Sequence, residues 1–140
     1  MRDFRNVAYA DTFALKDVVS KGKGQTISSG ILAKEDIEMY LYFLDADEEI
    51  SEMKAPYDNL IIVLEGELRI GLEPPVILGE GDAFVLPPNT QVSLHADKPN
   101  KHISILLPME QELIKNVEKS KKMKAKDMVD YRPGQIANLT

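Results

Sequence analysis

The sequence predicts an all-β domain, built as an antiparallel sandwich or barrel. Short apolar runs of strand length begin at Gln25 and recur to about residue 107. Clusters of turn residues separate these runs, for example at 79–82 and 86–89. Many short strands at regular spacing are typical of sandwiches and barrels. The predicted strands cover residues 25–33, 37–44, 60–65, 67–71, 75–78, 82–86, 91–96 and 101–107.

Composition narrows the class of protein. The chain has 140 residues, which suits one domain, and no cysteine, which excludes disulfides and thiolate metal sites. A net charge of −6 and a pI near 4.9 argue against a nucleic-acid partner, which needs a basic face. The sequence lacks an apolar signal segment and an apolar run of about 18 residues. We therefore expect a cytoplasmic protein without a membrane partner.

Two charged segments lie outside the predicted strands. Residues 45–59 form an acidic, polar segment of the length found at the mouth of a barrel, either a cation site or solvated surface. Residues 115–126 are rich in lysine and either attract an anion or form a solvated linker. The pattern changes after Pro108. Apolar residues then recur every four positions, at Met109, Leu113 and Val117, which predicts one apolar helical stripe.

The end of the chain resembles its beginning at a constant offset of 110 residues. Asn6-Val7 matches Asn116-Val117, and Gly24-Gln25 matches Gly134-Gln135. A period of this length corresponds to one barrel domain rather than to a solenoid unit. We interpret residues 1–108 as a barrel with an N-terminal lead-in, and residues 109–140 as a helical or extended tail that resembles the opening of a second barrel. The tail either pairs with the edge of a sheet or is the remnant of a second barrel that the chain does not contain.

Two motifs carry a resemblance to the cupin family. The run 60–70 resembles the first cupin motif, and the run 81–92 resembles the second. Gly66, Gly81 and Pro87 fall in register with the motifs. The resemblance implies an RmlC-like jelly-roll, an antiparallel double-stranded β-helix. The chain also resembles the first barrel of a bacterial two-cupin protein, followed by the start of the second barrel. This resemblance rests on the opening of the chain and on the similarity between its two ends.

The metal ligands of the cupin motifs are absent from this sequence. Most cupins hold a metal with three histidines and one carboxylate. The matching positions here are Val92 for the last histidine, Asn59 for the glutamate, and residues 52–55 for the first two histidines. Valine cannot ligate a metal, and a lysine near the site repels a cation. We therefore expect no metal and no cofactor.

The same motif register suggests a ligand-binding set that lines the barrel. Five residues make up this set: Met53, Asp58, Val92, His102 and Ser104. His102 shares a strand face with Ser104 and is either a base or donor in the cavity or a polar residue at a strand start. The tyrosines of strand 37–44 either bind a sugar or aromatic ring or belong to the core or an interface. His95 points to the opposite face.

Three classes of function remain open from the sequence. The first is a metal-free module that binds an unidentified small molecule or has a regulatory role. The second is a metal-independent enzyme, similar to sugar epimerase cupins or the ethanolamine-utilisation cupin, that uses a barrel-lining histidine or carboxylate. The third is a structural role in assembly. Strand 37–44 is apolar on both faces, which predicts a homodimer that covers the outer one.

Overall fold

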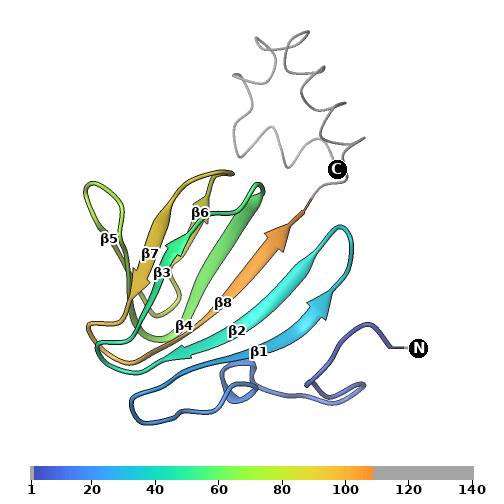
Figure 1. The fold of residues 1–140 in the computed structure, drawn as a ribbon. Coiled ribbons are helices and arrows are strands. Elements are labelled where there is room, and N and C mark those ends of the chain that lie inside the picture. Colours follow the sequence, from blue (N-terminus) through green and yellow to red (C-terminus); the bar gives the residue numbers. More distant parts are fainter. Residues whose placement is uncertain (1, 109–140) are drawn as a thin grey trace, which may run out of the picture. The chain divides into compact units, whose positions relative to one another are not determined.

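The computed structural model describes residues 2–108, so the predictions for residues 109–140 lie outside the described part of the chain. The described residues form eight antiparallel strands and one short 3-10 helix. Figure 1 shows how the strands are arranged. The predicted all-β antiparallel class is confirmed. The helix, η1, spans Leu15–Asp17. The strands are β1 (Thr26–Ala33), β2 (Glu38–Leu44), β3 (Glu49–Met53), β4 (Asp58–Ile70), β5 (Val76–Gly79), β6 (Ala83–Leu86), β7 (Val92–His95) and β8 (Asn100–Leu107).

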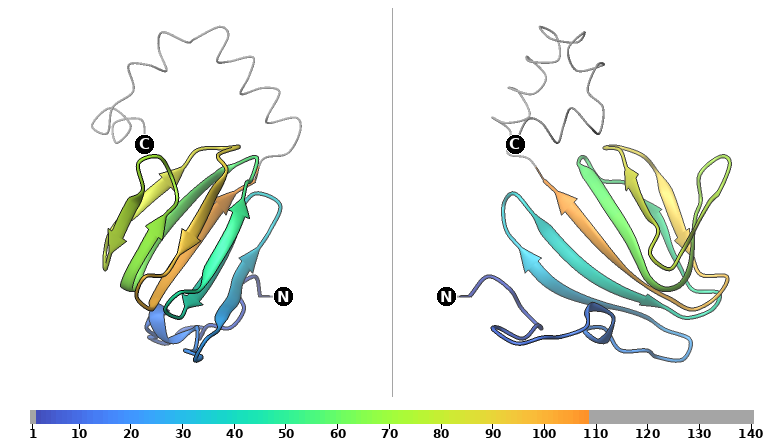
Figure 2. Two further views of the ribbon diagram at one scale, coloured as in Figure 1. Left: turned by 60° about the vertical axis from the view of Figure 1, so that its left-hand side comes forward. Right: turned by 180° about the vertical axis from the view of Figure 1, so that it is seen from behind.

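The strands form two layers that share the long strand β4. The first layer has the order β1-β2-β8-β4-β6, and the second has the order β5-β4-β7-β3. Residues 58–66 of β4 pair with β8, whereas residues 67–70 pair with β5. The sheet therefore curls back on itself as a half-barrel, which Figure 2 shows from two sides.

Two expectations about the strands were wrong. The turn expected at residues 65–67 is a bend inside one continuous strand, because Gly66 adopts a φ of +80° and a register shift separates Val63 from Glu65. A side chain at Gly66 would overlap the carbonyl oxygen of Pro99, so the close approach requires glycine. In addition, β3 lies within the segment expected to be loop, and pairs with β7.

An apolar core fills the space between the two layers. Ile61 and Val63 of β4 meet residues of the second layer such as Leu68 and Leu94, all four of them buried. These residues alternate along their strands with more exposed ones, as the period of two in a strand requires. The barrel interior is thus packed with aliphatic side chains over much of its length.

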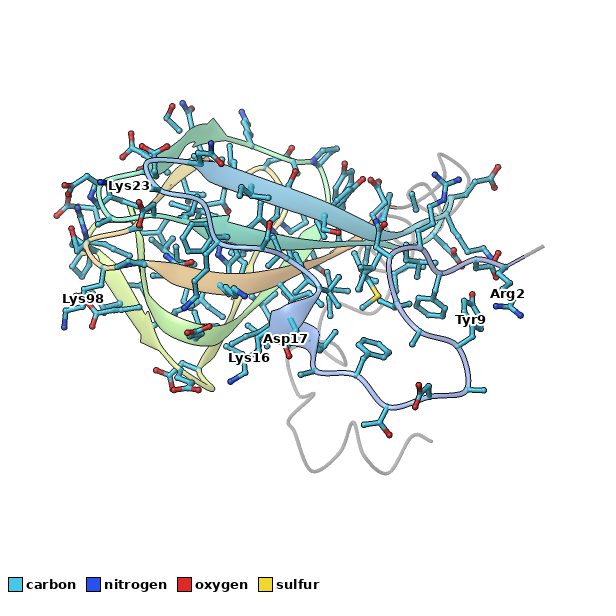
Figure 3. All side chains as sticks on the ribbon, turned by 90° about the horizontal axis from the view of Figure 1, so that it is seen from below. Arg2, Tyr9, Lys16, Asp17, Lys23 and Lys98 are labelled. Carbon is cyan, nitrogen blue, oxygen red and sulfur yellow. The ribbon has the colours of Figure 1, made fainter. Side chains whose placement is uncertain are left out.

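A second core covers the outer face of the first layer. The N-terminal arm, residues 2–25, runs along this face, where Figure 3 locates it by Tyr9, Lys16 and Asp17. Val19 of the arm is 1% exposed and packs with Leu41, Phe43 and Ile103. A backbone hydrogen bond of 3.0 Å from Arg5 to Ile31 ties the arm to β1.

This arrangement removes the reason for expecting a partner on β2. The outer face of the strand is covered by the chain's own arm, so covering it does not require a second copy. The sequence could not reveal this, because the apolar residues of the arm follow no regular period. Within residues 2–108, no helix is long and apolar enough to cross a membrane.

Candidate functional site

The first layer presents polar side chains to the barrel interior. On β2, Tyr40 and Tyr42 alternate with Leu41, which belongs to the outer core. On β8, His102 and Ser104 alternate with Ile103 in the same way. The register pairs Tyr42 with His102 and Tyr40 with Ser104, so these four residues form two adjacent rows on one face. Together with Glu38, Asn59 and Asn100, we call them the inner polar cluster.

His102 is the most deeply buried member of this cluster. Its side chain is 0% exposed and stacks on the ring of Tyr42, with 5.1 Å between the centroids and 20° between the planes. Its Nδ1 lies 2.9 Å from Oδ1 of Asn100. Its Nε2 has no hydrogen-bond partner among the described residues. Burial lowers the pKa of His102 to about 4, so the imidazole is neutral at physiological pH.

The two tyrosines differ in what holds their hydroxyl groups. Tyr40 donates a hydrogen bond of 2.6 Å to the carboxylate of Glu38. This bond, together with burial, raises the pKa of Tyr40 to about 12. Burial raises the pKa of Tyr42, and the charge of Glu38 adds to the effect. Both side chains therefore remain neutral hydroxyl groups across the physiological range.

A small hollow lies beside the cluster, between the layers. Asn59 lines it and is 4% exposed, and its Oδ1 has no hydrogen-bond partner in residues 2–108. The residues that line the hollow are Met53, Lys54, Ala55, Tyr57, Asn59, Leu86, Pro87, Thr90 and Val92. The hollow is therefore mostly apolar, with one buried and unsatisfied amide oxygen in its wall.

The structure separates the five predicted site residues into three groups. Met53 and Val92 are register partners, and both line the hollow. His102 and Ser104 share the inner face of β8 but do not line the hollow. Asp58 is exposed, because it alternates with the buried Asn59 and so points away from the barrel interior. A ligand-binding role for these residues remains a prediction.

Sequence reasoning missed three members of the cluster. Asn59 was identified only as the position of a lost metal ligand, not as a site residue. Asn100 precedes His102 by two residues on one strand, which is a signal that places both side chains on one face. Glu38 gives no such signal, because an acidic residue at the start of a strand is usually solvated.

The residues at the cupin metal position do not fit a transition metal. They offer the amide of Asn59, the thioether of Met53 and the alkyl side chain of Val92. No group of three or more histidine, aspartate or glutamate residues suited to an ion occurs in the described part of the chain. The chemistry of these donors gives at most one weak oxygen ligand and one soft sulfur ligand.

Comparisons with known proteins agree on the fold. No family model matches the sequence, and no curated protein matches it. A conserved protein of unknown function from Streptococcus pyogenes is 22% identical, with a TM-score of 0.74, and the match covers 79% of this chain and 97% of that one. A cupin superfamily protein from Desulfitobacterium hafniense is 18% identical, with a TM-score of 0.73, over 77% of this chain and 100% of that one.

A third structure has higher sequence identity over a shorter match. The cupin 2 conserved barrel domain protein from Leptotrichia buccalis is 30% identical, with a TM-score of 0.65. The match covers 68% of this chain but only 47% of that protein. The curled antiparallel half-barrel and its likeness to these structures identify the protein as having the RmlC-like cupin fold.

Proposed function

We propose that the protein is a metal-independent cupin that binds a small molecule at the inner polar cluster and the adjoining hollow. The observation that carries this proposal is the pair of buried polar atoms, His102 Nε2 and Asn59 Oδ1, that have no partner among residues 2–108. A buried polar atom without a partner costs about 1–3 kcal/mol, so such atoms in a native fold require an explanation. A ligand that satisfies both atoms supplies one.

The character of the surrounding side chains supports the same proposal. Ligand sites are mostly apolar with a few well-placed polar groups, and the hollow and the cluster share this composition. The hollow itself has a volume of about 10 Å³, enough for one water molecule, so a ligand must displace side chains that line it. The rings of Tyr40 and Tyr42, whose centroids lie 6.4 Å apart, add flat aromatic surface next to the polar atoms. A cytoplasmic location, expected from the sequence, remains part of this proposal.

A metal-independent enzyme is the weaker alternative. It is favoured by the neutral His102 and the hydroxyl groups of the tyrosines on one face, which are possible acid–base groups. Acid–base catalysis is most effective when the pKa lies near the operating pH. The pKa of His102, about 4, and that of Tyr40, about 12, both lie far from neutrality. The cluster is therefore better suited to binding than to proton transfer.

Screening a fragment library by ligand-observed NMR tests the proposed site. Ser104→Phe should abolish binding, because the larger ring fills the inner face of β8. Ile105→Phe is the matched control, since residue 105 belongs to the outer core of the same strand. The control should retain binding, and thermal unfolding should show that both variants are folded. Fragments that bind both variants equally, or a library without a single hit, would contradict the proposal.

We also propose that the protein forms a homodimer, now through the arm rather than through β2. Phe4, Tyr9 and Phe13 are each at least 40% exposed and line an apolar groove with their neighbours. Contiguous exposed aromatic surface is characteristic of interfaces. Sedimentation should show a dimer for the natural chain and a monomer for the variant with serine at these three positions. A natural chain that sediments only as a monomer at tens of micromolar would refute the dimer.

A further inference from the structure

We propose that the inner polar cluster selects ligands that donate a hydrogen bond, through a neutral O–H or N–H group, and rejects carboxylates. The basis is a fixed tautomer of His102, which leaves Nε2 as a bare acceptor directed at the barrel interior. This inference deepens the proposed function, and it rests on that function.

Asn100 sets the tautomer. Its side chain is 1% exposed, and its Nδ2 donates a hydrogen bond of 3.1 Å to the carbonyl oxygen of Glu67. This bond fixes the orientation of the amide, so Oδ1 is the atom that lies 2.9 Å from Nδ1 of His102. An amide oxygen can only accept a hydrogen bond, so Nδ1 must carry the proton.

The proton on Nδ1 determines what Nε2 can do. A neutral imidazole has one N–H group, and burial keeps this imidazole neutral. Nε2 is therefore an acceptor, and it has no donor among the described residues. A carboxylate placed there would set one acceptor against another, whereas a hydroxyl or amine N–H group would satisfy the lone pair.

The other polar groups on this face include acceptors, a committed donor and two hydroxyl groups. The hydroxyl groups of Tyr42 and Ser104 can each donate or accept, so they suit either kind of ligand and the selection rests on Nε2 of His102. The Oδ1 of Asn59 is a second buried acceptor without a partner in residues 2–108. The hydroxyl of Tyr40 already donates to Glu38, which places a negative charge on this face. The ammonium of Lys101, next to His102 in sequence, points to the outer face and donates to the carbonyl oxygen of Lys16. Lys54 lines the adjoining hollow and is exposed, so its charge is solvated.

Long-range proton–nitrogen NMR on the full chain tests the tautomer directly. The variant His95→Gln leaves His102 as the single histidine, so its two ring nitrogens are resolved. We expect a protonated Nδ1 and a bare Nε2 at pH 7. Asn100→Leu should produce a mixture of tautomers, whereas Asn100→Asp, which keeps an acceptor, should restore the Nδ1–H form. A protonated Nε2 in the parent protein would overturn the inference, even if fragments still bind the inner face.

Three matched probes test the selectivity: benzyl alcohol, benzyl methyl ether and benzoate. Only benzyl alcohol combines a neutral hydroxyl donor with the ring that the tyrosines can contact. It should shift the Nε2 resonance and bind about tenfold more tightly than the other two, the factor expected for one buried hydrogen bond. Equal binding of the ether or of benzoate would overturn the inference. An Nε2 resonance that benzyl alcohol does not shift would also overturn it, because an internal water would then be the partner of Nε2.

Discussion

The two faces of the first layer use the same strands for different purposes. On β8, Ile103 points outward into an apolar core completed by the N-terminal arm, whereas His102 and Ser104 point inward. The arm closes this outer core, with Val19 as its most buried residue. The inner face holds buried polar atoms whose hydrogen-bonding capacity is not used by the described residues.

The difference shows which face stabilises the fold and which face is available for binding. On the outer face, the arm completes an apolar core around Leu41, Phe43 and Ile103. On the inner face, the unsatisfied Nε2 of His102 and Oδ1 of Asn59 carry a free-energy cost that folding alone does not justify. Proteins commonly accept such local costs at functional sites. The following changes should affect the two faces separately.

The largest effect is expected from removing the cover of the outer face. Deleting residues 2–19 exposes Leu41, Phe43 and Ile103, each worth about 1.5–3 kcal/mol of burial. The sum approaches the whole stability of a typical domain, about 5–15 kcal/mol, so the shortened chain should unfold or aggregate. Urea denaturation followed by circular dichroism measures this.

The matched control is Thr12→Ala, at an exposed position of the same arm. It should change the free energy of unfolding by no more than about 0.5 kcal/mol. A shortened chain that unfolds at the same urea concentration as the parent would show that the arm contributes nothing to the outer core.

A smaller effect is expected from acid on the inner face. The pKa of His102 is about 4 in the folded protein, against 6.5 for a histidine side chain free in water. Between these values the unfolded chain binds a proton that the folded protein does not, so stability falls as the pH falls from 6.5 to 4. Below pH 4 this contribution levels off. The loss should reach about 3 kcal/mol.

The variant His102→Gln isolates this effect, because glutamine does not titrate. The free energy of unfolding of each protein is measured in urea at pH 7 and at pH 4. The decrease between these two pH values should be about 3 kcal/mol smaller for the variant than for the natural chain. The carboxylates titrate in both proteins and cancel in the comparison. An identical loss in the two proteins would mean that His102 is not buried as a neutral side chain.

The smallest effect is expected at the partly exposed end of the inner face. Tyr40→Phe removes the hydroxyl that donates to Glu38 and should lower the free energy of unfolding by about 1 kcal/mol. Tyr57→Phe is the control, since no hydrogen bond of its hydroxyl occurs among the described residues. Thermal unfolding compares the two variants. If Tyr57→Phe lowered the stability as much as Tyr40→Phe does, the hydrogen bond between Tyr40 and Glu38 would have no particular role.

Much of the fold followed from local pattern. Period-two alternation and turn residues located seven of the eight strands to within a few residues, with the segments 60–65 and 67–71 joined into β4. The missed strand, β3, lies in a polar segment whose composition resembles a loop. It is a strand because β7 offers backbone partners to it, as in the pairing of Ile50 with Leu94. Such pairing depends on residues distant in sequence.

The candidate site was less accessible to sequence reasoning. Motif register placed Val92 and Asn59 at the lost metal position, and alternation put His102 and Ser104 on one face. Asp58 was expected to line the barrel but is exposed. Residues 60–64 are apolar at every position, so no alternation in the sequence shows whether Asp58 or Asn59 points inward. Likewise, nothing in the sequence shows that Glu38 would accept a hydrogen bond from Tyr40.

The sequence by itself determined the all-β class, the cupin motifs and the loss of their metal ligands, because these depend on residue type and on spacing along the chain. The tertiary structure decided which partner each side chain has. It showed that the arm covers β2, that Asn100 orients His102, and that Nε2 is buried without a donor among residues 2–108. Hydrogen bonding and burial are properties of groups brought together in space, and the same sequence pattern is compatible with several such arrangements.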